Sequence, residues 1–256
     1  MSKSSLTDCK ILSPNHSGKR THKIDRITPH CVVGQLSAES IGHCFDSKNR
    51  KASCNYGIGK DGRVCLVVDE DNRSWCTSSN SNDQRAITIE CASDTKHPYT
   101  FTDACYNKLI DLTVDICKRY NKTKLVWISN KEKALAYKPK DNELQVTVHR
   151  WFASKSCPGD WMMSKMNDYV NKVNSKLTSE VKPVTHKINS NTNNKLPYKV
   201  KVTADALNYR KGPGVNYDIK GTITDRGIYT IVDEKNDWGK LGSGAGWISL
   251  KYTKKL

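Results

Sequence analysis

The segment VHRWFASKSCPGDW places a histidine, a lysine and a cysteine close together, followed by a Pro-Gly corner. Neutral imidazoles and thiolates are zinc ligands, and a catalytic zinc site has three protein ligands with one position left open. His149 and Cys157 supply two such ligands. His30, in RITPHCVVGQ, is the best candidate for the third, although spacing alone does not exclude His43 or His97.

Glu90 and Lys155 are the candidate catalytic side chains. Glu90 ends the strand-like run AITIE, where a carboxylate is costly to bury unless it is paired or accepts a proton from a metal-bound water. Lys155 is two residues before Cys157 and would stabilise an oxyanion beside the metal. Residue types alone leave simpler alternatives open: a solvent-facing or arginine-paired glutamate, a surface lysine, a packed His149 and a buried Cys157 thiol.

Strand-like and helical segments alternate through residues 1–177. Asp61-Gly62 separates two strand-like runs, as in a β-hairpin. The run 86–92 (AITIECA) is short, apolar and rich in β-branched residues, as in a buried central strand. Segment 102–121 has apolar residues at helical spacing behind a threonine or aspartate N-cap.

A second helix is predicted after Pro158, which suits a first helical turn because its missing N–H is not needed there. Strands interleaved with helices predict an α/β domain, with a mixed central β-sheet flanked by helices, over residues 1–177. The apolar face of the second helix consists of Met162, Met166, Tyr169, Val173 and Leu177.

The character of the chain changes after residue 177. Residues 178–197 are polar, with two prolines and four asparagines, and are predicted to be a linker. Residues 198–256 contain short strand-like runs separated by Gly, Asn and Asp turns, without a helical pattern. This pattern predicts a second, small all-β domain.

The chain has 42 Lys and Arg against 26 Asp and Glu, a formal net charge of +16, which indicates a polyanionic partner or environment. No helix-turn-helix or base-stacking pattern supports nucleic acid as that partner. No run approaches the roughly 20 apolar residues of a membrane span, and the N-terminus lacks the apolar run of a secretory signal. We therefore expect synthesis in the cytoplasm, no stable membrane insertion, and ten cysteines that are mostly buried, reduced thiols.

Residues 20 to 177 resemble the zinc-dependent N-acetylmuramoyl-L-alanine amidases, the family shared by phage lysozyme-type amidases and peptidoglycan recognition proteins. The resemblance rests on TPHCVVGQLSAESI, ASCNYGIGKDGRV, RSWCTSSNSNDQRAITIECAS and VHRWFASKSCPGDWM, which occur in the order of the family. The last of these contains the pattern His-x5-Lys-x-Cys-Pro-Gly, which is specific.

The resemblance implies a hydrolase that cleaves the amide between N-acetylmuramic acid and L-alanine of peptidoglycan with zinc-activated water. Glu90 would accept the proton of that water, and Lys155 with the metal would hold the oxyanion. One branch of the family has a tyrosine where this chain has Cys54, which leaves proton transfer to Glu90. The other residues that the resemblance implies are the zinc ligands His30, His149 and Cys157 and a substrate-side loop with Trp75, Asn82 and Asp83.

Residues 198–256 contain DALNYRKGPGVNYDIKGTI followed by DWGKLGSGAGWISLKY, with a Gly-Pro corner and paired tryptophans. On these motifs, the segment resembles a bacterial SH3 domain of the kind attached to wall hydrolases. Leu207 and Trp247 are expected in its core, and the basic charge of the whole chain suits anionic polymers of a Gram-positive wall. The residues expected to line a groove for a wall peptide or glycan are Tyr209, Arg210, Asn216 and Tyr217.

The two domains together are similar to a phage endolysin of the clostridial type, which acts on the wall after release through membrane holes or by lysis. A bacterial autolysin or sporulation amidase would have the same chemistry. Two other interpretations stay open: a peptidoglycan-binding protein without catalysis, and a peptidase in which Cys157 is a nucleophile paired with His149.

Overall fold

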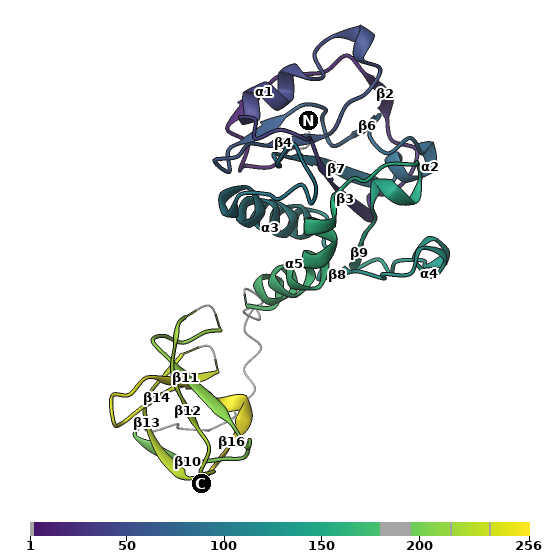
Figure 1. Ribbon diagram of the computed structural model, residues 1–256. Helices are drawn as coiled ribbons and strands as arrows, with labels where there is room; N and C mark the ends of the chain where they lie inside the picture. The colour runs from purple at the N-terminus through teal and green to yellow at the C-terminus, as the bar shows by residue number, and fades with distance from the viewer. Residues whose placement is uncertain (1–2, 180–195, 216, 236) are drawn as a thin grey trace. The chain divides into compact units, whose positions relative to one another are not determined.

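The computed structural model describes residues 3–179, 196–215, 217–235 and 237–256. The chain divides into two compact units, Met1–Val184 and Thr185–Leu256 (Figure 1). Most of the predicted linker, residues 180–195, lies outside the described residues, and its first two residues still belong to the last helix of the larger unit.

The larger unit is built on a seven-stranded mixed sheet with strand order β1-β5-β4-β7-β3-β9-β8. Neighbouring strands are parallel except β4 and β5, which pair antiparallel. A separate two-stranded ribbon pairs β2 with β6. The strands are β1 (Cys9–Lys10), β2 (His16–Lys19), β3 (Arg26–Cys31), β4 (Tyr56–Ile58), β5 (Val64–Leu66), β6 (Asn72–Ser74), β7 (Ala86–Cys91), β8 (Lys124–Val126) and β9 (Glu143–Val146).

The predicted hairpin and central strand are both confirmed. Asp61-Gly62 forms the turn between β4 and β5, and Gly62 has φ +83°, a backbone conformation that glycine adopts without strain. Strand β7 lies in the middle of the sheet between β3 and β4, and all of its residues except Glu90 are buried. Its β-branched side chains therefore pack on both faces, as expected of a central strand.

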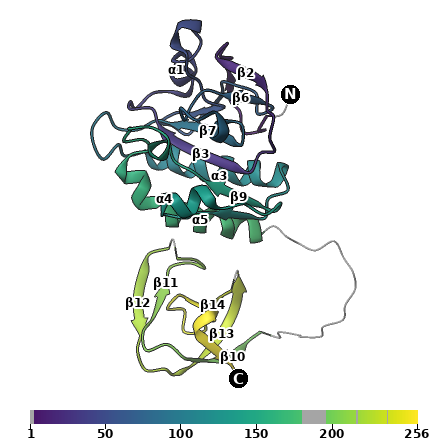
Figure 2. The ribbon, with the colours of Figure 1, turned by 90° about the vertical axis from the view of Figure 1, so that its right-hand side faces the viewer.

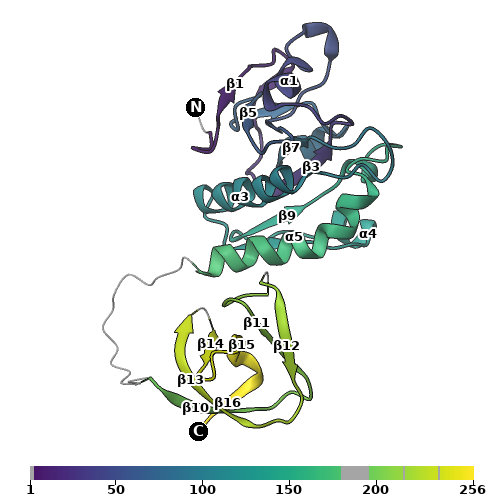
Figure 3. The same cartoon turned by 60° about the vertical axis from the view of Figure 1, so that its left-hand side comes forward.

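Helices cover both faces of this sheet. α3 (Asp103–Arg119) and α5 (Asp160–Ser179) lie side by side on one face (Figure 2), and α1 (Ala38–His43) lies on the other (Figure 3). The predicted N-cap of α3 is confirmed, because the Thr102 hydroxyl accepts a hydrogen bond from the Cys105 amide at 3.1 Å. The shorter helices are α2 (Asn80–Asp83), α4 (Lys131–Ala136), and the 3-10 turns η1 (Lys48–Arg50) and η2 (His149–Trp151).

Helix α5 has the predicted apolar face but not the predicted start. Met162, Met166, Tyr169, Val173 and Leu177 are all buried in the core between the helices and the sheet. The helix begins at Asp160, so Pro158 precedes it and is not part of its first turn. The reason is the backbone of Gly159, which has φ +88° and is not helical.

The smaller unit is a single antiparallel sheet with strand order β12-β11-β15-β14-β13-β10-β16. Its core contains Leu207, as expected. Trp247 is only half-buried, because its strand turns Ile248 inward instead, which corrects the prediction for that residue. The elements are β10 (Tyr198–Val202), β11 (Leu207–Arg210), β12 (Ile219–Ile223), β13 (Ile228–Lys235), β14 (Trp238–Leu241), β15 (Trp247–Ser249), η3 (Leu250–Tyr252) and β16 (Thr253–Lys255).

The fold class is therefore the predicted one: a mixed sheet flanked by helices, and a separate, small all-β unit of SH3-like type. Across the described ranges, no helix combines the length and apolarity that a membrane crossing would require.

Candidate active site

His30 and Glu90 lie next to each other because their strands are paired in register. β3 and β7 are parallel neighbours, and His30 pairs with Glu90 near the carboxyl ends of both. Paired residues of adjacent strands project from the same face of a sheet. His30 is buried, whereas the Glu90 side chain keeps a small exposed part.

His149 and Cys157 come from the segment between β9 and α5. β9 pairs with β3 on the side away from β7, so the chain leaving β9 reaches the carboxyl end of the same sheet. His149 opens the 3-10 turn η2. The Arg150 amide then donates to the Cys157 carbonyl at 3.1 Å, which folds the Cys157 loop back beside η2.

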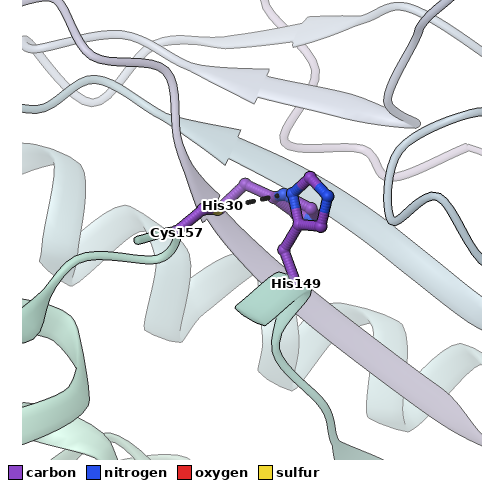
Figure 4. Close-up of side chains that lie close together, drawn as sticks. All are labelled: His30, His149 and Cys157. Atoms are coloured by element: carbon purple, nitrogen blue, oxygen red, sulfur yellow. Dashed lines mark hydrogen bonds between the residues drawn. The ribbon is translucent and has the colours of Figure 1, made fainter. Parts of the chain in front are cut away.

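The three predicted ligands converge at one place (Figure 4). Figure 4 draws His30 on its strand, His149 on the short helical turn and Cys157 on the loop. Cys157 Sγ lies 3.2 Å from His30 Nδ1, and the imidazole centroids of His30 and His149 are 5.0 Å apart. One ligand atom from each residue lies within 4.8 Å of the other two.

Burial keeps both imidazoles neutral. Desolvation, with the nearby His149, lowers the pKa of His30 well below its usual value. Desolvation and the neighbouring Lys155 ammonium lower the pKa of His149. Neutral imidazoles have a free lone pair, so both residues are in the protonation state that a metal ligand needs.

These residues fit a metal ion by a second criterion. His30 Nε2, His149 Nε2 and Glu90 Oε2 are buried and accept or donate no hydrogen bond among the described residues. Buried polar atoms are rarely left without a partner. Two neutral imidazoles and a thiol, which loses its proton on binding a metal, are donor types that suit a metal site with three protein ligands.

Glu90 has the properties of a proton acceptor. Burial raises its pKa to about 7, while hydrogen bonding from Cys76 and the charge of Arg50 act in the opposite direction. Its Oε1 atom lies 3.9 Å from His30 Nδ1. A carboxyl with a pKa near neutrality can both take and return a proton at physiological pH.

All five predicted metal-binding and catalytic residues line one cleft with a volume of 720 Å³. Lys155 is exposed at this cleft, between His149 and Cys157 along the chain. Together with desolvation, its charge lowers the pKa of the neighbouring His149 imidazole. The five residues are His30, Glu90, His149, Lys155 and Cys157.

Of the three residues predicted in the substrate-side loop, Trp75 is accessible from the cleft, whereas Asp83 and Asn82 are buried and bind other protein groups. Trp75 is half-buried, lines the cleft, and donates from its indole nitrogen to Ser17 Oγ at 2.7 Å. Asp83 borders the cleft but is buried, and it accepts the Thr77 hydroxyl at 2.6 Å and the Cys76 amide at 3.1 Å. Asp83 therefore holds the backbone of the loop.

Asn82 does not face the cleft. It is completely buried, and its amide oxygen accepts from Arg26 and Thr147 at 3.1 Å each. Its amide nitrogen donates to the Thr28 hydroxyl at 3.2 Å. With its side chain taken up by protein groups, Asn82 ties α2 to β3 and is not placed to contact a substrate, contrary to the expectation for this residue.

The structure adds cleft residues that the sequence analysis did not name. Cys76 lies with its Sγ 3.9 Å from Glu90 Oε1, and Arg50 and Tyr99 line the same cleft. No spacing pattern marks them, because each comes from a different loop. The other candidate histidines lie elsewhere: His43 pairs with Asp46, and His97 pairs with Asp160.

The candidate wall-binding residues of the smaller unit are only partly together. The Arg210 guanidinium donates to the Tyr217 carbonyl at 2.9 Å, and Tyr217 is 42% exposed. Tyr209 lines a shallow groove of 330 Å³ with Tyr229. Asn216 lies outside the described residues.

Several solved structures are similar to the chain at low sequence identity. The catalytic domain of PlyG matches with a TM-score of 0.50 and 16% identity, over 69% of this chain and 99% of that chain. The endolysin amidase LysCS from Clostridium intestinale URNW matches with a TM-score of 0.40 and 16% identity, over 63% and 97%. The endolysin of Thermus scotoductus MAT2119 bacteriophage Ph2119 matches with a TM-score of 0.43 and 16% identity, over 64% and 98%.

The comparison with PlyG concerns the fold, and no curated protein matches the chain. The sequence profile of the N-acetylmuramoyl-L-alanine amidases matches residues 20–160. This range is more than half of the 256 residues and includes the ligand cluster, Glu90 and Lys155. The chain therefore belongs to the N-acetylmuramoyl-L-alanine amidase family.

Proposed function

We propose that this protein is a zinc-dependent peptidoglycan hydrolase that cleaves the amide bond between N-acetylmuramic acid and L-alanine. The observation that carries the proposal is the convergence of His30, His149 and Cys157 beside Glu90 in one cleft. Membership of the amidase family supports the bond that is cleaved.

The side chains of the cleft have distinct tasks in this reaction. Bound zinc supplies a Lewis acid and lowers the pKa of a water molecule. His30, His149 and Cys157 hold the ion, and Glu90 Oε2, which has no other partner among the described residues, accepts a proton and returns it to the leaving nitrogen. Lys155 offers its charge to the carbonyl oxygen as this becomes negative.

The bond is tested by digesting purified Gram-positive peptidoglycan with the full chain. We expect new N-terminal alanine to appear without new reducing sugar ends. The appearance of reducing ends instead would assign a glycosidic bond, and tight wall binding without soluble fragments would favour a binding protein without catalysis.

The metal and the base are tested with two measurements on the same preparation. We expect about one zinc per chain, loss of activity with a chelator and recovery with zinc. Glu90→Gln should reduce the rate by roughly 10²- to 10⁴-fold. Glu132→Gln, on the exposed side of α4, is the matched control and should leave the rate unchanged.

A thiol peptidase with Cys157 as nucleophile is the competing candidate. A nucleophilic cysteine needs a lowered pKa, whereas burial raises the pKa of Cys157 well above its usual value. Its sulfur is also placed against His30 Nδ1 at 3.2 Å. Activity that survives the chelator but not a thiol-blocking reagent would support this alternative and refute the zinc mechanism.

We further propose that the chain consists of a catalytic domain at 1–177, a linker at 178–197 and a wall-binding SH3 domain at 198–256. Wall binding of the full chain should weaken when Tyr209 or Tyr217 is replaced by alanine, and with added salt. Membership of the N-acetylmuramoyl-L-alanine amidase family supports action on the wall, and we propose that this action follows release from a host cell.

A further inference from the structure

A second group of metal-binding side chains adjoins the first. One ligand atom each of His30, Cys76 and Glu90 lies within 4.8 Å of the other two. In the described part of the chain, this group and the group of His30, His149 and Cys157 are the two that bring three such donors so close. Both groups contain His30, and Cys76 belongs to the second alone.

The backbone holds Cys76 at this position. Cys76 follows β6, and its amide donates to Asp83 Oδ2 at 3.1 Å. Asp83 is buried and also accepts from the Thr77 hydroxyl. Its carboxylate therefore fixes the turn through both the Cys76 amide and the Thr77 hydroxyl. The Cys76 side chain is half-buried, lines the cleft and lies 3.9 Å from Glu90 Oε1. A dissolved ion can therefore reach it.

His30 limits the two groups to one ion at a time. Its Nδ1 atom faces Cys157 Sγ at 3.2 Å and Glu90 Oε1 at 3.9 Å. A neutral imidazole has only one unprotonated nitrogen, either Nδ1 or Nε2, and binds one metal ion through it. An ion held by His30, Cys76 and Glu90 therefore takes His30 away from the group that includes Cys157.

The donors of the second group suit a thiophilic divalent ion. The Glu90 carboxylate and a Cys76 thiolate together carry two negative charges, which a divalent ion neutralises inside a largely buried site. Soft thiolate ligands favour soft metals over hard cations. Binding forms a metal–sulfur bond and releases the thiol proton of Cys76 to solvent.

We propose that His30, Cys76 and Glu90 form a second, inhibitory metal site that captures thiophilic divalent ions such as Cd²⁺. Occupation of this site removes both a metal ligand and the proton acceptor from the hydrolytic arrangement. The metal site itself does not depend on the proposed amidase reaction, whereas the inhibition rests on it.

The binding test uses the full chain after its metal has been removed with a chelator and the chelator has been washed out. Cd²⁺ is then added as the probe in the presence of a thiol-free reductant. In Cys157→Ser the first group has lost its thiol, and we expect a thiolate-to-cadmium charge-transfer band that arises from Cys76. The double variant C157S/C76S should lose this band. The matched control is C157S/C44S, because Cys44 is a half-buried free cysteine outside both groups, and it should keep the band.

Either of two results would overturn the site: no band in Cys157→Ser, or a band that persists in C157S/C76S. Circular dichroism checks that each variant is folded, and the alanine pair C157A/C76A repeats the test if a serine variant is not. In wall digestion, Cys76→Ser should need about tenfold more Cd²⁺ for half-inhibition than wild type, or about 1.4 kcal/mol. A wild-type protein without hydrolysis would refute the proposed function and leave the band assignment unaffected.

Discussion

Replacing Glu90 with glutamine should stabilise the chelator-treated protein in a pH-dependent way. Only 13% of the Glu90 side chain is exposed, and burial raises its pKa from 4.5 to about 7. A raised carboxyl pKa means that the folded state holds a proton that the unfolded state releases, so stability falls as pH rises through this window. A rise of about 2.5 in the pKa lowers the free energy of unfolding by about 3 kcal/mol, and this loss is complete above pH 7.

Glutamine has no charge to desolvate, so the variant escapes this cost. Near pH 4, where both states of the wild type are protonated, the two proteins should unfold at nearly the same temperature. Near pH 8, the larger unit of the variant should unfold about 6–12 °C higher, using roughly 2–4 °C per kcal/mol for a unit of this size. Calorimetry of the full chain at both pH values, with chelator and reductant present, measures the difference.

Glu143→Gln is a control with the opposite sign. Glu143 is also buried, but the Tyr137 hydroxyl, donating at 2.5 Å, lowers its pKa. Its contribution is present above the unfolded pKa and is lost as pH falls through the folded pKa, so its glutamine variant should be destabilised near pH 8. A Glu90→Gln protein that is equally or less stable than wild type at both pH values would refute a raised pKa at Glu90.

Three further substitutions test an ion pair and a helix cap of the larger unit and the packing of the smaller unit. Glu70→Ala should lower stability by about 1–3 kcal/mol in urea unfolding, because it removes the buried carboxylate that Arg119 binds at 2.5 and 2.6 Å and the acceptor of the Tyr56 hydroxyl, while Arg119 keeps its ion pair with Asp115. Thr102→Ala should cost about 1 kcal/mol in the same assay through the lost N-cap of α3, and Thr102→Ser should restore most of it. Gly246→Ala should lower the melting temperature of the smaller unit and leave that of the larger unit in place, because an added Cβ would lie 2.4 Å from the Arg210 carbonyl oxygen. An unchanged melting temperature would mean that the backbone there adjusts freely.

The elements that could be predicted from the sequence are those fixed by local interactions. The N-cap at Thr102, the turn at Asp61-Gly62 and the apolar face of α5 depend on neighbouring residues, and all three are present. The three metal-ligand candidates could be found from residue chemistry and from the resemblance of their motifs, and the structure brings them within 4.8 Å of one another.

The features that could not be predicted depend on contacts between distant segments. Cys76 approaches Glu90 only because β6 and β7 lead to the same cleft, and no local pattern records that arrangement. Asn82 belongs to a motif that indicates substrate contact, yet its side chain hydrogen-bonds to buried groups on β3 and just after β9. Ile248, not Trp247, lies in the core of the smaller unit. Successive residues of a strand point to opposite faces, so an error of one residue in assigning the inward face exchanges the two.

The pairing of β3 with β7 sets the spacing between His30 and Glu90 by the main chain. Six consecutive residue pairs fix the register of the two strands, so the position of each side chain along its strand does not depend on a loop. Insertions or deletions in the connections that border the cleft could therefore alter which molecules enter it without moving these two groups apart. Conversely, one extra residue inserted within either strand would turn one of the two toward the opposite layer of helices, and no rearrangement of the surrounding loops could bring it back.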